Sequence, residues 1–256
     1  MPAGNRYVKR RDRPRPGSIP DVLDIFRCEV RFYREIGPVV GLRVPACFEA
    51  VDTGDGTLLV LENLSDWDSG ADPVAAANVL ADLHRDWSGR ALARWPWLRR
   101  PGAAVDLVEN LYGEVWPSLV ARPTVPPQVS TLAQRLAGKV AESERAAGAA
   151  GPDTLVHGDA SLANMRTGPG GVIALLDWED VSAAPGVTDL AWLLVSSVEP
   201  EAWDDVIAAY GTPVGLTETL PAAAVQGLLS MSDAPAGSAE ERAWIGRLNE
   251  AASRLT

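Results

Sequence analysis

The sequence predicts an α+β fold in two parts: a small antiparallel sheet with one helix in residues 1–63, then a mostly helical part in residues 64–256. Short β-rich runs near residues 7–9, 46–51 and 57–61 predict the sheet. After residue 64 the apolar residues recur at helical spacing over long segments. One β-rich stretch with tight turns, near residues 154–177, interrupts these helices.

In the first part, the β-rich run near residue 9 is followed by a helix and then by two strands. The helix is predicted from apolar residues at a helical interval: Val22, Ile25, Phe26, Val30 and Tyr33. The turn at residues 52–56 contains two glycines and joins the later two runs as a hairpin.

In the second part, helical periods predict helices at residues 74–87, 129–147, 190–198, 201–210 and 239–255. The segment from 213 to 221 begins and ends with proline, so we expect a break there. The prolines between residues 94 and 127 interrupt the pattern, and the Ala-Gly run at 146–151 predicts a flexible connection.

Three polar residues stand at intervals that suit phosphoryl transfer. Asn164 follows Asp159 by five residues, and Asp177 follows Asn164 by thirteen. Strand-like runs at 154–156 and 172–176, separated by a loop and a glycine-rich turn, would place Asn164 and Asp177 on either side of one hairpin. Transfer of a phosphoryl group needs a carboxylate for the hydroxyl proton and ligands for the metal on the phosphates. The alternative interpretation is a capped loop in which these side chains only form turns.

The segment resembles the catalytic core of the aminoglycoside phosphotransferase and choline kinase-like enzymes, which are relatives of the protein kinases. Their His-Gly-Asp-x-x-x-x-Asn motif is intact from His157 to Asn164, and their second metal aspartate matches Asp177 in Asp177-Trp178-Glu179. The resemblance implies a protein-kinase-like two-lobed fold, with Asp159 as the catalytic aspartate and with Asn164 and Asp177 holding Mg²⁺. It also implies that His157 supports the loop rather than reacts.

The resemblance extends upstream to the nucleotide site, with ATP or GTP as phosphate donor. Lys9 matches the family's lysine for the nucleotide phosphates, and Glu29 matches the glutamate that pairs with it. The interlobe hinge, whose backbone binds the adenine in this family, matches Glu62, Asn63 and Leu64. We expect structural roles for His84, at the end of a helix, and for Asp189, at the start of one.

The sequence departs from the family pattern before Lys9. A glycine-rich hairpin should precede the lysine strand, but only eight residues do, and two strands with a turn need roughly twenty. Residues 1–5 contain a single glycine. We therefore expect a truncated first lobe with an open phosphate side. Three interpretations stay open: the natural chain starts further upstream, the protein works without the hairpin, or it no longer transfers phosphate. A second copy of the chain or a partner protein is one way to cover the open side.

Composition excludes several classes of protein. No apolar run reaches the roughly 18 residues of a membrane span, and the basic N-terminus is not followed by the apolar segment of a secretory signal. Two cysteines and two histidines without metal-ligand spacing disfavour a zinc site and fit a reducing cytoplasm. The basic start lacks the interleaved aromatics of a nucleic-acid arm. The net charge of −11 fits attraction of a cationic substrate, or simply solubility.

Two classes of function remain. The first is a Mg²⁺- and nucleotide-dependent kinase for a hydroxyl of a small molecule, such as an aminoglycoside or other antibiotic, an amino alcohol or a sugar, or for a Ser or Thr of a precursor peptide. The second is a non-catalytic kinase-like protein that binds a ligand or partner. Intact Asp159, Asn164 and Asp177 favour the kinase, whereas the departure before Lys9 favours the binding protein. We predict the kinase.

Overall fold

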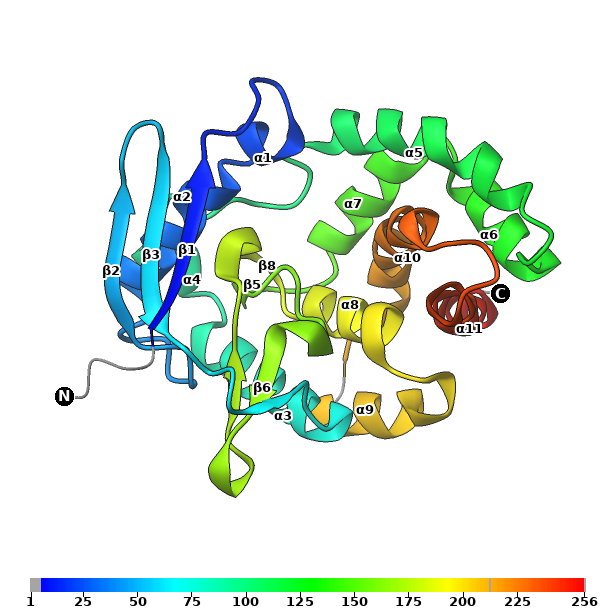
Figure 1. Ribbon diagram of the computed structural model, residues 1–256. Helices are drawn as coiled ribbons and strands as arrows, with labels where there is room; N and C mark the ends of the chain where they lie inside the picture. Colours follow the sequence, from blue (N-terminus) through cyan, green and yellow to red (C-terminus); the bar gives the residue numbers. More distant parts are fainter. Residues whose placement is uncertain (1–5, 212, 256) are drawn as a thin grey trace.

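The computed structural model describes residues 6–211 and 213–255, and residues 1–5, with their single glycine, lie outside this range. The predicted α+β class is confirmed. A three-stranded antiparallel sheet stands at one end of the molecule, and helices make up most of the rest (Figure 1). The strands of this sheet occur in the order β1-β3-β2, with bounds β1 (Arg6–Asp12), β2 (Cys47–Asp52) and β3 (Gly56–Glu62).

The helix that carries Glu29 packs against one face of the sheet. It is α2 (Ile25–Arg31), which follows the short α1 (Ile19–Val22) and continues into the π-helical turn η1 (Phe32–Ile36). Side chains of β3 alternate between partly and fully buried, and Leu59 is among those that face α2 in the core. This two-residue period is the one expected of a strand with one covered face.

Two small sheets carry the loop of the predicted motif. β5 (Asp153–Val156) pairs antiparallel with β8 (Ser182–Pro185) and leads into that loop. The loop ends in the 3-10 turn η2 (Leu162–Asn164). β6 (Met165–Thr167) and β7 (Ile173–Leu175) then form the predicted hairpin, with β4 (Asp68–Ser69) as its third strand.

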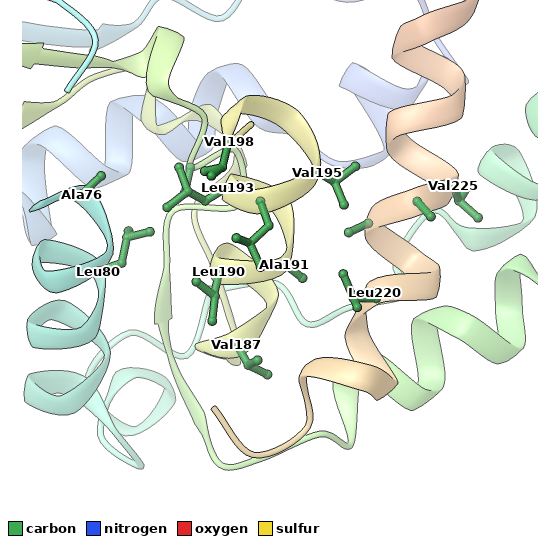
Figure 2. Close-up of a cluster of buried hydrophobic side chains, with 14 of the residues drawn as sticks. Ala76, Leu80, Val187, Leu190, Ala191, Leu193, Val195, Val198, Leu220 and Val225 are labelled. Carbon is green, nitrogen blue, oxygen red and sulfur yellow. The ribbon is translucent and has the colours of Figure 1, made fainter. Parts of the chain in front are cut away.

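Helix α8 (Val187–Ser197) is the centre of the larger core. Figure 2 shows its side chains between those of α3 (Pro73–Trp87) and α10 (Leu216–Asp233), with Leu190 on the side of Leu80 and Val195 on the side of α10. Seven of its eleven residues are buried, because neighbouring helices cover most of its circumference. The helix therefore holds Asp189, in its first turn, at a fixed place.

The remaining helices complete this part of the chain, and several of them pack against α8 (Figure 1). No helix in the described part of the chain is long and apolar enough to cross a membrane. Their bounds are α3 (Pro73–Trp87), α4 (Ala91–Arg94), α5 (Val105–Val120), α6 (Pro127–Leu136), α7 (Val140–Gly148), α9 (Trp203–Tyr210), α10 (Leu216–Asp233) and α11 (Ala239–Arg254), with 3-10 turns η3 (Pro169–Gly171), η4 (Trp178–Asp180) and η5 (Pro200–Ala202).

Two sequence predictions about helix boundaries were wrong. The single helix expected at residues 129–147 is two helices, α6 and α7, because Gly138 between them has a left-handed φ of 72°. The break expected from 213 to 221 ends earlier, since α10 begins at Leu216 and includes Pro221. Pro221 is the sixth residue of α10 and lacks the N–H that would bond the carbonyl four residues earlier, so the packing of the buried face of the helix outweighs this loss.

An aromatic stack joins the two parts of the chain. The rings of Phe32 in η1 and Trp178 in η4 are parallel, with centroids 4.0 Å apart and an interplanar angle of 7°. Both side chains are fully buried. Because Trp178 lies between Asp177 and Glu179, the stack holds both carboxylates beside α2.

Candidate active site

A buried carboxylate fixes the start of the motif loop. Asp189 Oδ2 accepts the backbone N–H of His157 at 2.7 Å, and Oδ1 accepts that of Gly158 at 2.9 Å. His84 Nε2 lies 3.0 Å from Oδ2, and the other nitrogen of that ring lies 2.7 Å from the Tyr210 hydroxyl. Burial alone would raise the pKa of Asp189, but these hydrogen bonds outweigh it and hold the pKa below its usual value. The expected structural roles of His84 and Asp189 are confirmed.

Gly158 is required by the shape of the loop. Its φ is 86°, and a Cβ at this position would stand 2.3 Å from the carbonyl oxygen of Asp180. Any side chain here would therefore push apart the loop and the segment that follows Asp177. The close approach brings Asp180 beside the catalytic candidate Asp159.

Two donors orient Asp159. The indole Nε1 of Trp192 donates to Oδ1 at 2.5 Å, and the amide of Asn164 donates to Oδ2 at 2.8 Å. The same amide also donates to the Asp159 carbonyl at 3.0 Å. Sequence reasoning missed Trp192. The available signal was its place on α8, one turn after Asp189, on the helix that supports the loop.

His157 ties the loop to the hairpin. Its ring is fully buried, and Nε2 lies 2.7 Å from the carbonyl of Leu176, so it supports the loop as expected. Leu176 in turn donates its N–H to the Asn164 carbonyl at 2.8 Å. Asn164 and Asp177 therefore flank one hairpin, as the sequence predicted.

Lys9 lies among three carboxylates from both parts of the chain. Its Nζ is 2.7 Å from Glu29 on α2 and 3.2 Å from Glu179, and it also contacts Asp177 Oδ1. The expected Lys9–Glu29 pair is present, whereas the contacts with Asp177 and Glu179 were not expected. Glu179 is also 3.6 Å from Arg11. Even with both cations counted, the carboxylates outnumber them, so the cluster has an excess of negative charge.

Burial and charge shift the pKa values of this cluster. Burial lowers the pKa of Lys9, but Glu29 and Asp177 outweigh it, so its pKa lies above the ordinary value. Burial raises the pKa of Glu29 to about 7, although Lys9 opposes the rise. Burial is also the main reason that the pKa of Glu179 is raised. A single ammonium shared by three carboxylates compensates each of them incompletely.

Asp177 has an unusual backbone. Its φ of 59° and ψ of 62° lie in the left-handed region. Among the described residues other than glycine, Asp24 is the one other residue with a positive φ. Such a conformation costs about 1 kcal/mol or more and is common at functional sites. Here it ends β7 and turns the chain sharply into η4, while 39% of the Asp177 side chain stays exposed.

The hinge candidates lie where β3 leaves the sheet. Glu62 accepts the backbone N–H of Ala46 at 3.0 Å and pairs with Arg43 at 2.6 Å. Burial opposes these bonds, but together they lower the pKa of Glu62. Asn63 accepts the N–H of Ser65 at 3.0 Å, and Leu64 is buried. The side chains of Glu62 and Asn63 therefore fix the backbone at the end of β3.

A cavity of about 620 Å³ opens on the other side of Asp159. Asp159, Asp180, Trp192 and Arg99 line one side of it. Apolar side chains of α5 and α10 contribute to the rest, and Glu144 of α7 also reaches it. Lys9, Asn164 and Asp177 do not line this cavity, so Asp159 lies between the cavity and the charged cluster.

The chain matches the model of a family described as the phosphotransferase enzyme family over residues 2–224. Among curated proteins, none matches this chain. An aminoglycoside phosphotransferase from Streptomyces rimosus, solved with ADP and streptomycin, is similar in structure, with 18% identity, 88% of this chain and 87% of that chain covered, and a TM-score of 0.57. A choline kinase from Streptococcus pneumoniae shows 17% identity and a TM-score of 0.58. The alignment covers 100% of this chain and 87% of the choline kinase. A spectinomycin phosphotransferase, solved with ADP and spectinomycin, shows 10% identity and a TM-score of 0.58. The alignment covers 99% of this chain and 88% of the spectinomycin enzyme.

We predict that Asp189→Asn destabilises the protein and displaces the motif loop. An amide in place of the carboxylate would point N–H groups at the N–H of His157 or Gly158, which leaves buried donors unpaired. The free energy of unfolding, measured by urea denaturation, should fall by about 2–3 kcal/mol. Asp204→Asn removes an equally charged but exposed side chain and should change it by less than about 0.5 kcal/mol. Equal stability of the two variants would contradict the bracing role.

Proposed function

The chain belongs to the phosphotransferase enzyme family, and we propose that it transfers the terminal phosphate of ATP or GTP to a hydroxyl of a small molecule. The observation that carries this proposal is the place of Asp159, between a charged cluster and a cavity. Phosphoryl transfer needs a carboxylate at such a boundary, because donor and acceptor approach it from opposite sides. Two of the solved structures of similar fold hold ADP, which supports a nucleotide donor.

Asp159 receives the proton of the acceptor hydroxyl in this proposal. Trp192 and Asn164 each donate to one of its oxygens, so the carboxylate is held before the acceptor arrives. A base that is already oriented avoids the cost of ordering it during the reaction. The hydroxyl would approach from the cavity, which Asp159 lines.

Asn164 and Asp177 would hold Mg²⁺. The amide nitrogen of Asn164 is engaged by Asp159, which directs its oxygen elsewhere, and the Asp177 carboxylate is partly exposed. Carboxylate and amide oxygens are the ligands that Mg²⁺ prefers, and the cluster has negative charge in excess. Bound Mg²⁺ would neutralise charge on the nucleotide phosphates.

Lys9 changes partners when the nucleotide binds. Its contact with Asp177 occupies the carboxylate that a metal ligand must free, whereas its pair with Glu29 is buried. We expect Glu29 to keep Lys9 in place while the ammonium turns from Asp177 toward the phosphates. The backbone of Glu62, Asn63 and Leu64 would bind the adenine at the hinge.

The acceptor is a hydroxyl compound with an amine, such as an amino alcohol or an aminoglycoside. Four carboxylates line the cavity in addition to the internally paired Asp189: Glu144, Asp159, Asp180 and Asp233. The two arginines of the same lining leave a negative excess, which favours a cation. The similar solved enzymes include one with streptomycin and one with spectinomycin.

We predict that Asp159→Asn lowers turnover by about a hundredfold or more, since it removes the base but keeps the size of the side chain. Turnover is measured with ATP and with GTP on a panel of amino alcohols, aminoglycosides, sugars, serine and seryl peptides. Nucleotide affinity should stay nearly unchanged. Asp82→Asn removes an exposed aspartate and should keep full turnover.

Full activity of Asp159→Asn would exclude this residue as the base. If the wild-type chain phosphorylates no member of the panel but binds nucleotide, the result supports the non-catalytic binding protein instead.

We also predict that Asp177→Ala abolishes the Mg²⁺-dependent part of nucleotide binding, because it deletes a metal ligand. The measurement is calorimetric titration of the nucleotide with and without Mg²⁺. The control is Glu49→Ala, which removes one negative charge from an exposed position of β2. If Mg²⁺ improves nucleotide affinity equally in wild type and Asp177→Ala, the metal lies elsewhere.

A further inference from the structure

Arg99 is fixed in the wall of the cavity beside Asp159. Its carbonyl accepts the N–H of Ala183 at 2.8 Å, in a parallel bridge with Ser182 of β8. The side chain is 16% exposed and lines the cavity together with Asp159 and Trp192. The guanidinium is therefore mostly desolvated and held by a rigid backbone.

The hydrogen bonds of this guanidinium are poorly satisfied. Nε is buried without a partner, and the Tyr33 hydroxyl is the one other such side-chain atom among the described residues. The two hydrogen bonds of Arg99 both come from Nη2 and are long, 3.4 Å to the Glu179 carbonyl and 3.5 Å to Asp180. Folded proteins rarely leave a buried cation so incompletely paired, and a planar guanidinium binds best to two oxygens at once.

The position of Arg99 indicates whether its ligand group belongs to the phosphate donor or to the acceptor. The cavity that it lines includes Asp159 but none of Lys9, Asn164 and Asp177. A ligand group at Arg99 thus belongs to the acceptor side of Asp159. On the proposed function, this is the molecule whose hydroxyl receives the phosphate.

We propose that Arg99 binds a carboxylate of the acceptor, which makes the acceptor a hydroxyl compound with both an ammonium and a carboxylate group, such as an amino acid or a short peptide. This inference rests on the proposed function. Asp159 and Asp180 would repel a simple anion, so the ammonium is needed beside the carboxylate. Glu144 lines the same cavity and offers a carboxylate for this ammonium, and burial raises its pKa.

The test compares ligands that differ only in this group. Calorimetry measures binding of L-serine against L-serinamide, and of glycyl-L-serine against its C-terminal amide, to the wild-type chain, to Arg99→Gln and to Arg99→Lys. Arg85→Gln removes the same charge from an exposed position, where Arg85 pairs with Asp82. A titration with inorganic phosphate shows whether Arg99 instead binds a free anion.

The wild-type chain and Arg85→Gln should bind the carboxylate member of at least one pair about tenfold more tightly than its amide. Arg99→Gln should reverse this preference, because the remaining carboxylates favour the cationic amide. Arg99→Lys should keep part of the preference, since it retains the charge but not the planar fork.

Several results would overturn the proposal. One is that the wild-type chain, in both ligand pairs, binds the amide more tightly or binds both members equally. This result needs the wild-type chain only, so it is decisive even if Arg99→Gln fails to fold. Another is a carboxylate preference that persists in Arg99→Gln, and a third is Arg99-dependent binding of phosphate alone. Calorimetry needs no turnover, so an Arg99-dependent preference without phosphoryl transfer counts against the proposed function only. Turnover without that preference counts against this inference only.

Discussion

The ammonium of Lys9 is the group on which the arrangement of the two parts of the chain depends. It comes from β1, pairs with Glu29 on α2, and contacts Asp177 and Glu179 after β7. One desolvated cation thus joins the sheet, its helix and the hairpin segment of the helical part, beside the Phe32–Trp178 stack. Because three carboxylates share it, the cluster is stable only with a further positive charge or with a raised pKa, and Glu29 shows the latter.

The motif loop is built on the opposite principle. Asp189 has its hydrogen bonds satisfied by the backbone amides of His157 and Gly158 and by His84, without any ligand. A network that is complete in itself keeps the loop rigid. On the proposed function, the site combines an oriented base, Asp159, with a charged cluster that rearranges, and this division suits an enzyme that binds a highly charged nucleotide next to a fixed catalytic group.

Sequence reasoning succeeded where the chemistry is local. Asp159, Asn164 and Asp177 lie within nineteen residues on one loop and hairpin, so their spacing predicted their geometry. Lys9 and Glu29 are twenty residues apart, and only the family resemblance paired them. Trp192 and Arg99 reach the site through tertiary packing, and the spacing of the motif does not point to them. Glu179 stands in the segment that matches the family, but nothing in the sequence indicated its contact with Lys9. The break at Gly138 was missed because the apolar period continues across it. The helix α10 was expected to begin later because the tertiary packing that carries it past Pro221 has no sequence pattern.

On the proposed function, Lys9 exchanges Asp177 for nucleotide phosphates while it keeps Glu29. A crystal structure with Mg²⁺ and a non-hydrolysable ATP analogue would show this exchange. We expect Asn164 and Asp177 to bind the metal, and Lys9 Nζ to remain within hydrogen-bond distance of Glu29 but to have left Asp177 for a phosphate oxygen. A nucleotide bound away from Lys9, or an unchanged Lys9–Asp177 contact beside a bound nucleotide, would contradict it.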